Sequence, residues 1–302
     1  MAHAAIESSA VTSLAAQLPA TASLPDVAPT ILVFDSGVGG LTVFREVAKA
    51  RPDARLVYAA DDAAFPYGAL TDDVMLERVG HVVDRLIADV APDLVIIACN
   101  TISTLALPSL RARHALPFIG TVPAIKPACI ASRTKRVSVL ATPGTVRRDY
   151  TAGLVREFAQ GCDVALVPSD RLAGLAEAAM AGDPVDDEDI AAEIAPCFVS
   201  ADGRRTDTVV LACTHYPLLV DRFERLAPWP VTWMDPAPAI ARRVTQLIGP
   251  APVLSDTVPD TGPVRLISTL RPFEPERVTA IVGRAVADPE VLASARPFTS
   301  SS

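Results

Sequence analysis

The fold is decided by the stretch Leu94-Val-Ile-Ile-Ala-Cys-Asn-Thr101, a continuous apolar run that ends in small and polar residues. A short apolar run of this kind predicts a strand covered on both faces, which is typical of parallel sheets. The pattern returns one domain length later as Thr208-Val-Val-Leu-Ala-Cys-Thr-His215. The chain therefore carries an internal repeat, in which a buried strand ends in Ala-Cys and two polar residues.

Strands and helices alternate around these two runs. Further strands are expected at Thr30–Phe34, Arg55–Ala60, Val137–Ala141 and Val164–Val167, and helices at Leu41–Ala50, from Thr71 to about Val90, at Val146–Ala159 and at Arg171–Ala181. The alternation predicts β-α-β units, and so an α/β fold of mostly parallel sheets flanked by helices. The strand that runs into Asp35-Ser-Gly37 has a looser counterpart in Leu140-Ala-Thr-Pro-Gly-Thr145. We therefore expect two pseudo-symmetric domains with the active site in the cleft between them.

Proline-bearing connectors set the expected domain boundaries. Gly120–Pro127 is a plausible crossover into the second domain, and Trp229–Pro238 would carry the chain back. The expected division is a first α/β domain over residues 30–124 plus 237–302, and a second over 125–236. Residues 1–29 are rich in Ala, Ser and Thr and contain no Lys or Arg, which favours a flexible extension over a secretory signal.

Composition excludes several classes of function. The 302 residues are 50% hydrophobic and carry a net charge of −8, which argues against a general nucleic-acid binder. No apolar run reaches the roughly 18 residues that would span a bilayer. The five cysteines are an odd number without a C-x-x-C pair, which argues against a disulfide framework and favours the cytoplasm. The four histidines show no zinc-site spacing, so no metal is expected.

Cys99 and Cys213 differ from the other three cysteines because each follows a buried strand and precedes two hydrogen-bonding residues. The others are expected to be small buried residues. Two thiols that face one cleft suit a nearly mirror-symmetric reaction, in which a proton leaves one face of a carbon and another arrives on the opposite face. That reaction is racemisation. His215 and Asp35 are candidates to exchange protons with these thiols or to shift their pKa values.

Two loops and the lysines complete the expected site. Asp35-Ser-Gly-Val-Gly-Gly40 matches neither the G-x-G-x-x-G nor the G-x-x-x-x-G-K-[ST] nucleotide-binding motif. We therefore expect a tight turn whose backbone N–H groups and Ser36 face an anionic ligand. Phe65-Pro-Tyr-Gly68 is equally compatible with a plain turn and with a ligand loop. Arg147 and Arg148 are expected on the solvated surface. None of the three lysines is well placed for a Schiff base, which favours a mechanism without a cofactor.

Five segments resemble those of the bacterial glutamate racemases, a branch of the aspartate/glutamate racemase superfamily. They span about Thr30 to Arg243, and the resemblance weakens after Gly249. The segments are Phe34-Asp-Ser-Gly-Val-Gly-Gly-Leu-Thr42, Pro66-Tyr-Gly68, Ala98-Cys-Asn-Thr101, Ala141-Thr-Pro-Gly-Thr145 and Ala212-Cys-Thr-His-Tyr-Pro-Leu218.

The resemblance implies a role for each matching residue. Cys99 and Cys213 would be the two bases, assisted by Asp35 and His215 respectively. Pro66, Tyr67 and Gly68 would hold the side-chain carboxylate of the substrate. Glu177 is the best match for a glutamate that supports the second cysteine in the family, although the segment around it departs from the family pattern. The residues that would hold the amino and carboxylate groups are Ser36, Asn100, Thr101, Thr145 and Thr214.

The resemblance also implies interconversion of L- and D-glutamate without a cofactor, in the cytoplasm, to supply D-glutamate for peptidoglycan. It implies a homodimer, and the charge and the lack of a long apolar run argue against binding to nucleic acid or membrane. Two alternatives stay open. One is a racemase or isomerase of another small acid such as aspartate, and the other is a non-catalytic binding or regulatory protein, against which the presence of both cysteines counts.

Overall fold

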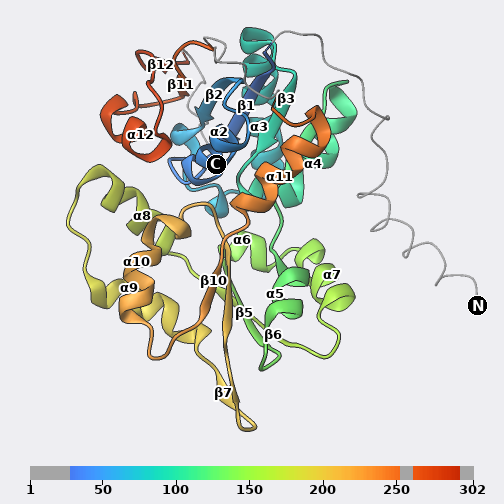
Figure 1. Cartoon of the computed structure of the whole chain (residues 1–302), viewed down its shortest axis with the longest axis vertical. Helices are drawn as coiled ribbons and strands as arrows, with labels where there is room; N and C mark the ends of the chain where they lie inside the picture. The colour runs from blue at the N-terminus through green and yellow to red at the C-terminus, as the bar shows by residue number, and fades with distance from the viewer. Residues whose placement is uncertain (1–27, 252–260, 293–302) are drawn as a thin grey trace, which may run out of the picture.

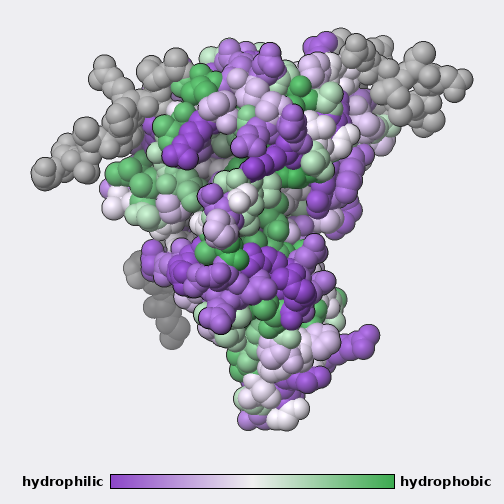
Figure 2. Space-filling model, turned by 90° about the vertical axis from the view of Figure 1, so that its left-hand side faces the viewer, coloured by the Kyte–Doolittle hydropathy of each residue, from purple (hydrophilic) through white to green (hydrophobic). Residues whose placement is uncertain are grey.

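The structure, a computed structural model, describes residues 28–251 and 261–292, and shows two lobes of parallel sheet and helices (Figure 1). All but the last two residues of the expected extension lie outside this part of the chain. On the face in Figure 2, hydrophobic surface is interspersed with hydrophilic residues. Within the described ranges, no helix combines the length and apolar character needed to cross a membrane.

The first lobe is built on a six-stranded sheet of order β12-β11-β2-β1-β3-β4, in which every neighbouring pair is parallel. Its apolar strands are buried on both faces by helices, as continuous hydrophobic runs require. The elements from the first part of the chain are β1 (Thr30–Asp35), α2 (Leu41–Ala50), β2 (Arg55–Ala60), α3 (Asp72–Val90), β3 (Leu94–Ile97), α4 (Asn100–Arg113) and β4 (Phe118–Gly120).

The second lobe is built on a four-stranded parallel sheet of order β10-β9-β5-β6. A short antiparallel hairpin lies at its far end (Figure 1). The elements are α5 (Ile125–Ala131), β5 (Arg136–Ala141), α6 (Pro143–Val146), α7 (Asp149–Phe158), β6 (Asp163–Pro168), α8 (Leu172–Ala181), α9 (Asp187–Ile194), β7 (Ser200–Ala201), β8 (Arg204–Arg205), β9 (Thr208–Ala212), α10 (Val220–Leu226) and β10 (Thr232–Met234).

After β10 the chain returns to the first lobe. Helices α11 and α12 both pack against α2, and β11 pairs with β2 at what would otherwise be the edge of the sheet. The elements of this returning segment are α11 (Ala237–Ile248), β11 (Arg265–Ser268), α12 (Pro275–Val282) and β12 (Glu290–Val291).

The internal repeat is visible in the strand order. The run β2-β1-β3-β4 of the first sheet corresponds to β6-β5-β9-β10 of the second, so that β3 matches β9 and β1 matches β5. The predicted α/β class with two pseudo-symmetric sheets is therefore confirmed.

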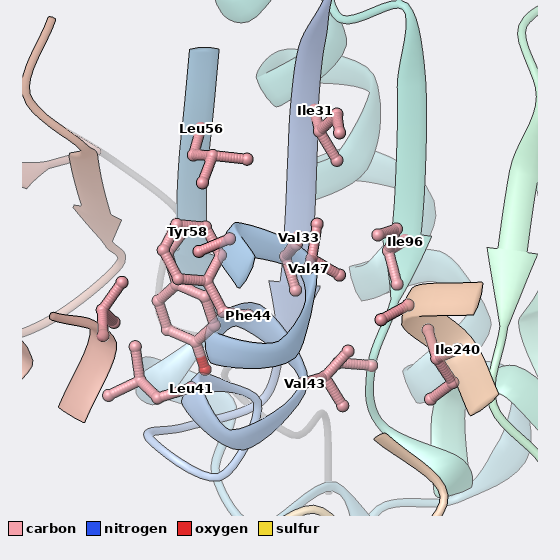
Figure 3. Close-up of a cluster of buried hydrophobic side chains, with 14 of the residues drawn as sticks. Ile31, Val33, Leu41, Val43, Phe44, Val47, Leu56, Tyr58, Ile96 and Ile240 are labelled. Atoms are coloured by element: carbon pink, nitrogen blue, oxygen red, sulfur yellow. The ribbon is translucent and has the colours of Figure 1, made fainter. Parts of the chain in front are cut away.

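Hydrophobic packing fixes the strand ends in place. In the first lobe, α2 presents its apolar face to the sheet, and its side chains interlock with those of β1 and β2 (Figure 3). The rings of Phe44 and Tyr58 meet edge to face at 5.5 Å between centroids. The Tyr58 hydroxyl, otherwise buried in this cluster, donates to Gly37 O at 2.5 Å, and so ties the core to the loop after β1.

One expected helix is wrong in its extent. The run predicted as a single helix over Val146–Ala159 is divided, because α6 ends at Val146 and α7 begins only at Asp149. The side chain of Thr142 accepts a hydrogen bond from the Thr145 N–H and caps α6, so the first turn starts earlier than the periodicity suggested. Arg148 adopts an extended conformation between the two helices.

Candidate active site

The carboxyl ends of the central strands of both sheets meet between the lobes. Thr101, just after β3, places its hydroxyl 2.9 Å from that of Thr142, just after β5. On the other side of the meeting point, the Thr42 hydroxyl lies 3.3 Å from Thr214 O, just after β9. Ligands bind beyond the carboxyl ends of strands in open α/β sheets, and here two such edges close on each other.

Cys213 lies at the end of a hydrogen-bonded relay. Its sulfur is 3.8 Å from His215 Nδ1, and His215 Nε2 is 2.7 Å from Glu177 Oε1. The same Glu177 oxygen accepts the N–H of Val38 at 2.8 Å, from the glycine turn of the first lobe. The His215 ring is thus held on both nitrogens, with Nδ1 facing Cys213 and Nε2 facing Glu177.

The surroundings of His215 favour its charged form. Burial by itself lowers the pKa of this imidazole, but hydrogen bonds to Cys213 and Glu177, together with the negative charges of Cys213 and Asp35, raise it to about 10. A cationic imidazole next to Cys213 Sγ stabilises negative charge on that sulfur.

Cys99 has different neighbours. Its sulfur lies 4.0 Å from the Ser36 hydroxyl, whose oxygen is 3.2 Å from Asp35 Oδ1. Burial, the charge of Asp35 and, to a smaller extent, the charge of Cys213 raise the pKa of the Cys99 thiol, so it holds its proton. Burial also raises the pKa of Asp35, against the opposing effect of His215. The other oxygen, Asp35 Oδ2, is buried without a hydrogen-bond partner. The two thiols therefore rest in unequal environments.

The glycine turn allows the second lobe to approach. A side chain at Gly39 would lie 2.5 Å from His215 Nδ1, and one at Gly37 would overlap the Glu177 carboxylate. Three backbone N–H groups of this turn bind carboxylates of the protein itself. Those of Ser36 and Gly37 donate to Asp35, and that of Val38 donates to Glu177. The expectation that these amides face an external anion is thus wrong for these three.

The Phe65–Gly68 loop lies against the second lobe. The Phe65 ring is 5.3 Å from the His215 ring, and Gly68 lies against Thr142. Pro66 is at the exposed side of the turn, whereas the Tyr67 side chain is buried in the first lobe and its hydroxyl donates to Asp61. Only the backbone at Tyr67 is therefore free to face the cleft.

Polar side chains gather beside Cys99. Both amide atoms of Asn100, next to Cys99, are buried and lack a hydrogen-bond partner. Thr145 Oγ1 lies 3.4 Å from that of Thr101, and both approach Thr142. Thr142 itself was not singled out from the sequence, although its place directly after a buried strand is the same signal that marked the cysteines.

Arg148 also differs from its expected surface role. It forms an ion pair with Asp72, at the first turn of α3, and so links the two lobes beside the cleft. The sequence gives no local sign of this contact, because the partners are far apart in the chain. In the described ranges, no three His, Cys, Asp or Glu side chains cluster in a way that could hold a metal ion.

Comparison with known proteins gives a consistent result. The Asp/Glu/hydantoin racemase family model matches residues 40–244. A glutamate racemase of Brucella anthropi is 55% identical over 226 residues, which is 74% of this chain and 81% of that protein. A glutamate racemase of Agrobacterium fabrum is 54% identical over 224 residues, 74% of this chain and 82% of its own length.

Among solved structures, Escherichia coli glutamate racemase in complex with L-glutamate and the activator UDP-MurNAc-Ala superimposes with a TM-score of 0.77. The two are 36% identical, over 88% of this chain and 98% of that one. The family match covers more than half of the chain, and the relatives match over most of their own length. The chain therefore belongs to the Asp/Glu/hydantoin racemase family, in the isomerase group of the glutamate racemases.

Proposed function

We propose that this protein interconverts L- and D-glutamate by a two-base mechanism that uses Cys99 and Cys213 and no cofactor. The observation that carries the proposal is the pair of thiols at matching strand ends of the two lobes. Cys99 has the Asp35 carboxylate nearby, through Ser36, and Cys213 has the His215 imidazole. The glutamate racemases of Brucella anthropi and Agrobacterium fabrum support the choice of substrate.

In one direction, Cys213 acts as the base. As a thiolate, Cys213 removes the α-proton of glutamate beside the His215 imidazole, and forms an S–H bond as the C–H bond breaks. The Cys99 thiol, whose pKa is raised by burial, then gives its proton to the opposite face of the carbanion. The product is the other enantiomer, and Cys99 is left as the thiolate.

In the reverse direction the roles exchange. Cys99 removes the proton and Cys213 returns one, so each cysteine serves one enantiomer. Asp35 would take the Cys99 proton before the reaction, because burial raises the pKa of this carboxyl. Ser36 bridges Asp35 and Cys99.

The substrate is held by groups on both lobes. Asn100, Thr101, Thr145 and Thr214 would bind the amino and α-carboxylate groups, and the backbone of Pro66-Tyr67-Gly68 would bind the distal carboxylate. The buried, unpartnered amide of Asn100 supports this assignment, because a buried polar group without a partner is costly unless a ligand satisfies it. We further propose that the enzyme is a cytoplasmic homodimer that supplies D-glutamate for peptidoglycan.

The test is circular dichroism of L- and D-glutamate incubated with the protein, without added pyridoxal phosphate and with L-aspartate as the comparison substrate. We expect activity on both glutamate enantiomers and a loss of about 10²–10⁴-fold in Cys99→Ser and in Cys213→Ser. Cys162→Ser, at a half-buried thiol directly before β6 and so at the amino end of the second sheet, is the matched control and should keep activity. Turnover of aspartate alone would replace the proposed substrate, and no turnover of either would favour a binding protein.

A further inference from the structure

Asp61 is a fully buried carboxylate that lies beneath the Phe65–Gly68 loop. Its Oδ2 accepts the Tyr67 hydroxyl at 2.5 Å and Arg78 Nε at 2.8 Å. Its Oδ1 accepts Arg78 Nη2 at 2.5 Å and the Thr269 hydroxyl at 2.7 Å. Both oxygens are therefore satisfied, and the charge is paired with a guanidinium that is itself buried. We call these four side chains the Asp61 anchor.

The anchor fixes the direction of the Tyr67 side chain. Burial and the negative charge of Asp61 raise the pKa of the Tyr67 hydroxyl well above its usual value, so this group remains a proton donor. A buried carboxylate with two-pronged arginine pairing is rigid, because any movement would leave charges unpaired in a low-dielectric environment. The Tyr67 backbone is thus held at a set distance from the core of the first lobe.

Asp62 extends the anchor to the returning segment of the chain. Its carboxylate accepts the backbone N–H groups of Thr269, Leu270 and Arg271 at 2.8 to 2.9 Å. These hydrogen bonds tie the connection between β11 and α12 to Asp62, three residues before the Phe65–Gly68 loop. This connection lies after Gly249, in the part of the sequence where the family resemblance is weak.

The other side of the loop lies against the second lobe. Phe65 packs on the hydrophobic cluster of that lobe and on the His215 ring, and Gly68 lies against Thr142 and Gly144. A shift of the loop would therefore change the space between the lobes, next to the relay of Cys213.

We propose that Asp61, Arg78 and Thr269 are positioning residues, which hold the Phe65–Gly68 loop at a fixed depth and so set the length of the dicarboxylic amino acid that fits. The inference rests on the proposed function, since it assigns the loop to the distal carboxylate. Glutamate and aspartate differ by one methylene group, for which a rigid site discriminates about 10–200-fold. A loosened loop loses part of that discrimination.

The test compares two variants that each remove one hydroxyl from the anchor and leave the Asp61–Arg78 pair intact. These are Tyr67→Phe and Thr269→Val. Tyr150→Phe is the matched control, because Tyr150 is a partly buried tyrosine on α7 of the second lobe, whereas the Asp61 anchor belongs to the first lobe. Steady-state kinetics would be measured with both glutamate enantiomers and with L-aspartate, and hydrogen–deuterium exchange would be followed in peptides that cover residues 61–71.

For both anchor variants we expect KM for glutamate to rise about three- to tenfold while kcat stays within about twofold, the pattern of lost uniform binding. The ratio of kcat/KM for aspartate to that for glutamate should rise, and residues 61–71 should exchange faster. The control should change none of these.

An unchanged KM in both variants would overturn the inference, as would an equal rise in Tyr150→Phe. An unchanged substrate ratio would overturn the specificity role. If the wild-type protein fails to racemise glutamate, the proposed function fails on its own, and the exchange data still decide the anchor. Faster exchange confined to residues 61–71 supports the anchor, and unaltered exchange refutes it.

Discussion

At the scale of single residues, Glu177 joins the two lobes through one carboxylate oxygen, which contacts both Val38 N and His215 Nε2. The hydrogen bond to Glu177 is one of the causes that raise the pKa of His215 to about 10. Glu177→Gln should lower that pKa, because the amide no longer favours the imidazolium. We expect kcat to fall about 10²-fold. The alkaline limb of the pH–rate profile, where His215 loses its proton, should move to lower pH.

The pH profile separates this electrostatic effect from simple loss of structure. Glu157→Gln, at an exposed position on α7, is the control and should keep the wild-type profile. An alkaline limb that stays in place in Glu177→Gln would show that the carboxylate does not act through His215.

At the scale of elements, the glycine turn and helix α8 respond oppositely to an added methyl group. Gly39→Ala would place a carbon 2.5 Å from His215 Nδ1, so the turn or the histidine must move, and activity should be lost with little unfolding. Gly174→Ala in α8 meets no atom within 4 Å, and should stabilise the protein by about 0.5–1 kcal/mol with full activity. Thermal unfolding and racemisation rates measure both effects. Retained activity in Gly39→Ala would mean that the close contact is not needed for catalysis.

At the scale of the whole molecule, a substrate that bridges the two lobes should stabilise their closed arrangement. Glutamate at a hundred times its Kd should add about 2.7 kcal/mol, which for a chain of this size raises Tm by about 4 °C. Aspartate at the same concentration should raise Tm less, because it reaches fewer of the groups on the opposite lobe. The measurement is differential scanning calorimetry of Cys99→Ser, in which we expect turnover to be about 10²–10⁴-fold slower. Equal shifts with both amino acids would contradict the assignment of the loop to substrate length.

Much of this architecture could be predicted from the sequence, since it depends on local patterns. The two Ala-Cys strands and the strand that ends in Asp35 are buried apolar runs, and their alternation with helices specifies parallel sheets. Contacts between distant residues could not be predicted in this way. Tyr67 is turned inward by Asp61, Arg78 and Thr269, the last of them 208 residues from Asp61. The early start of α6 depends on the Thr142 cap, and the break before α7 on the extended backbone of Arg148, and periodicity shows neither.

The pairing of β11 with β2 has a consequence for the solubility of the chain. An unpaired strand edge offers free N–H and C=O groups to another molecule and is a site of aggregation. In the first lobe the returning segment covers the edge of β2, whose residues after Arg55 are buried. The equivalent strand of the second lobe, β6, is an outer strand of its sheet, but it begins with Asp163 and ends with Pro168, which discourage further pairing. A chain that stopped at Gly249 would keep every proposed catalytic residue but expose the apolar edge of β2. The segment after Gly249 thus protects the protein against aggregation through that edge.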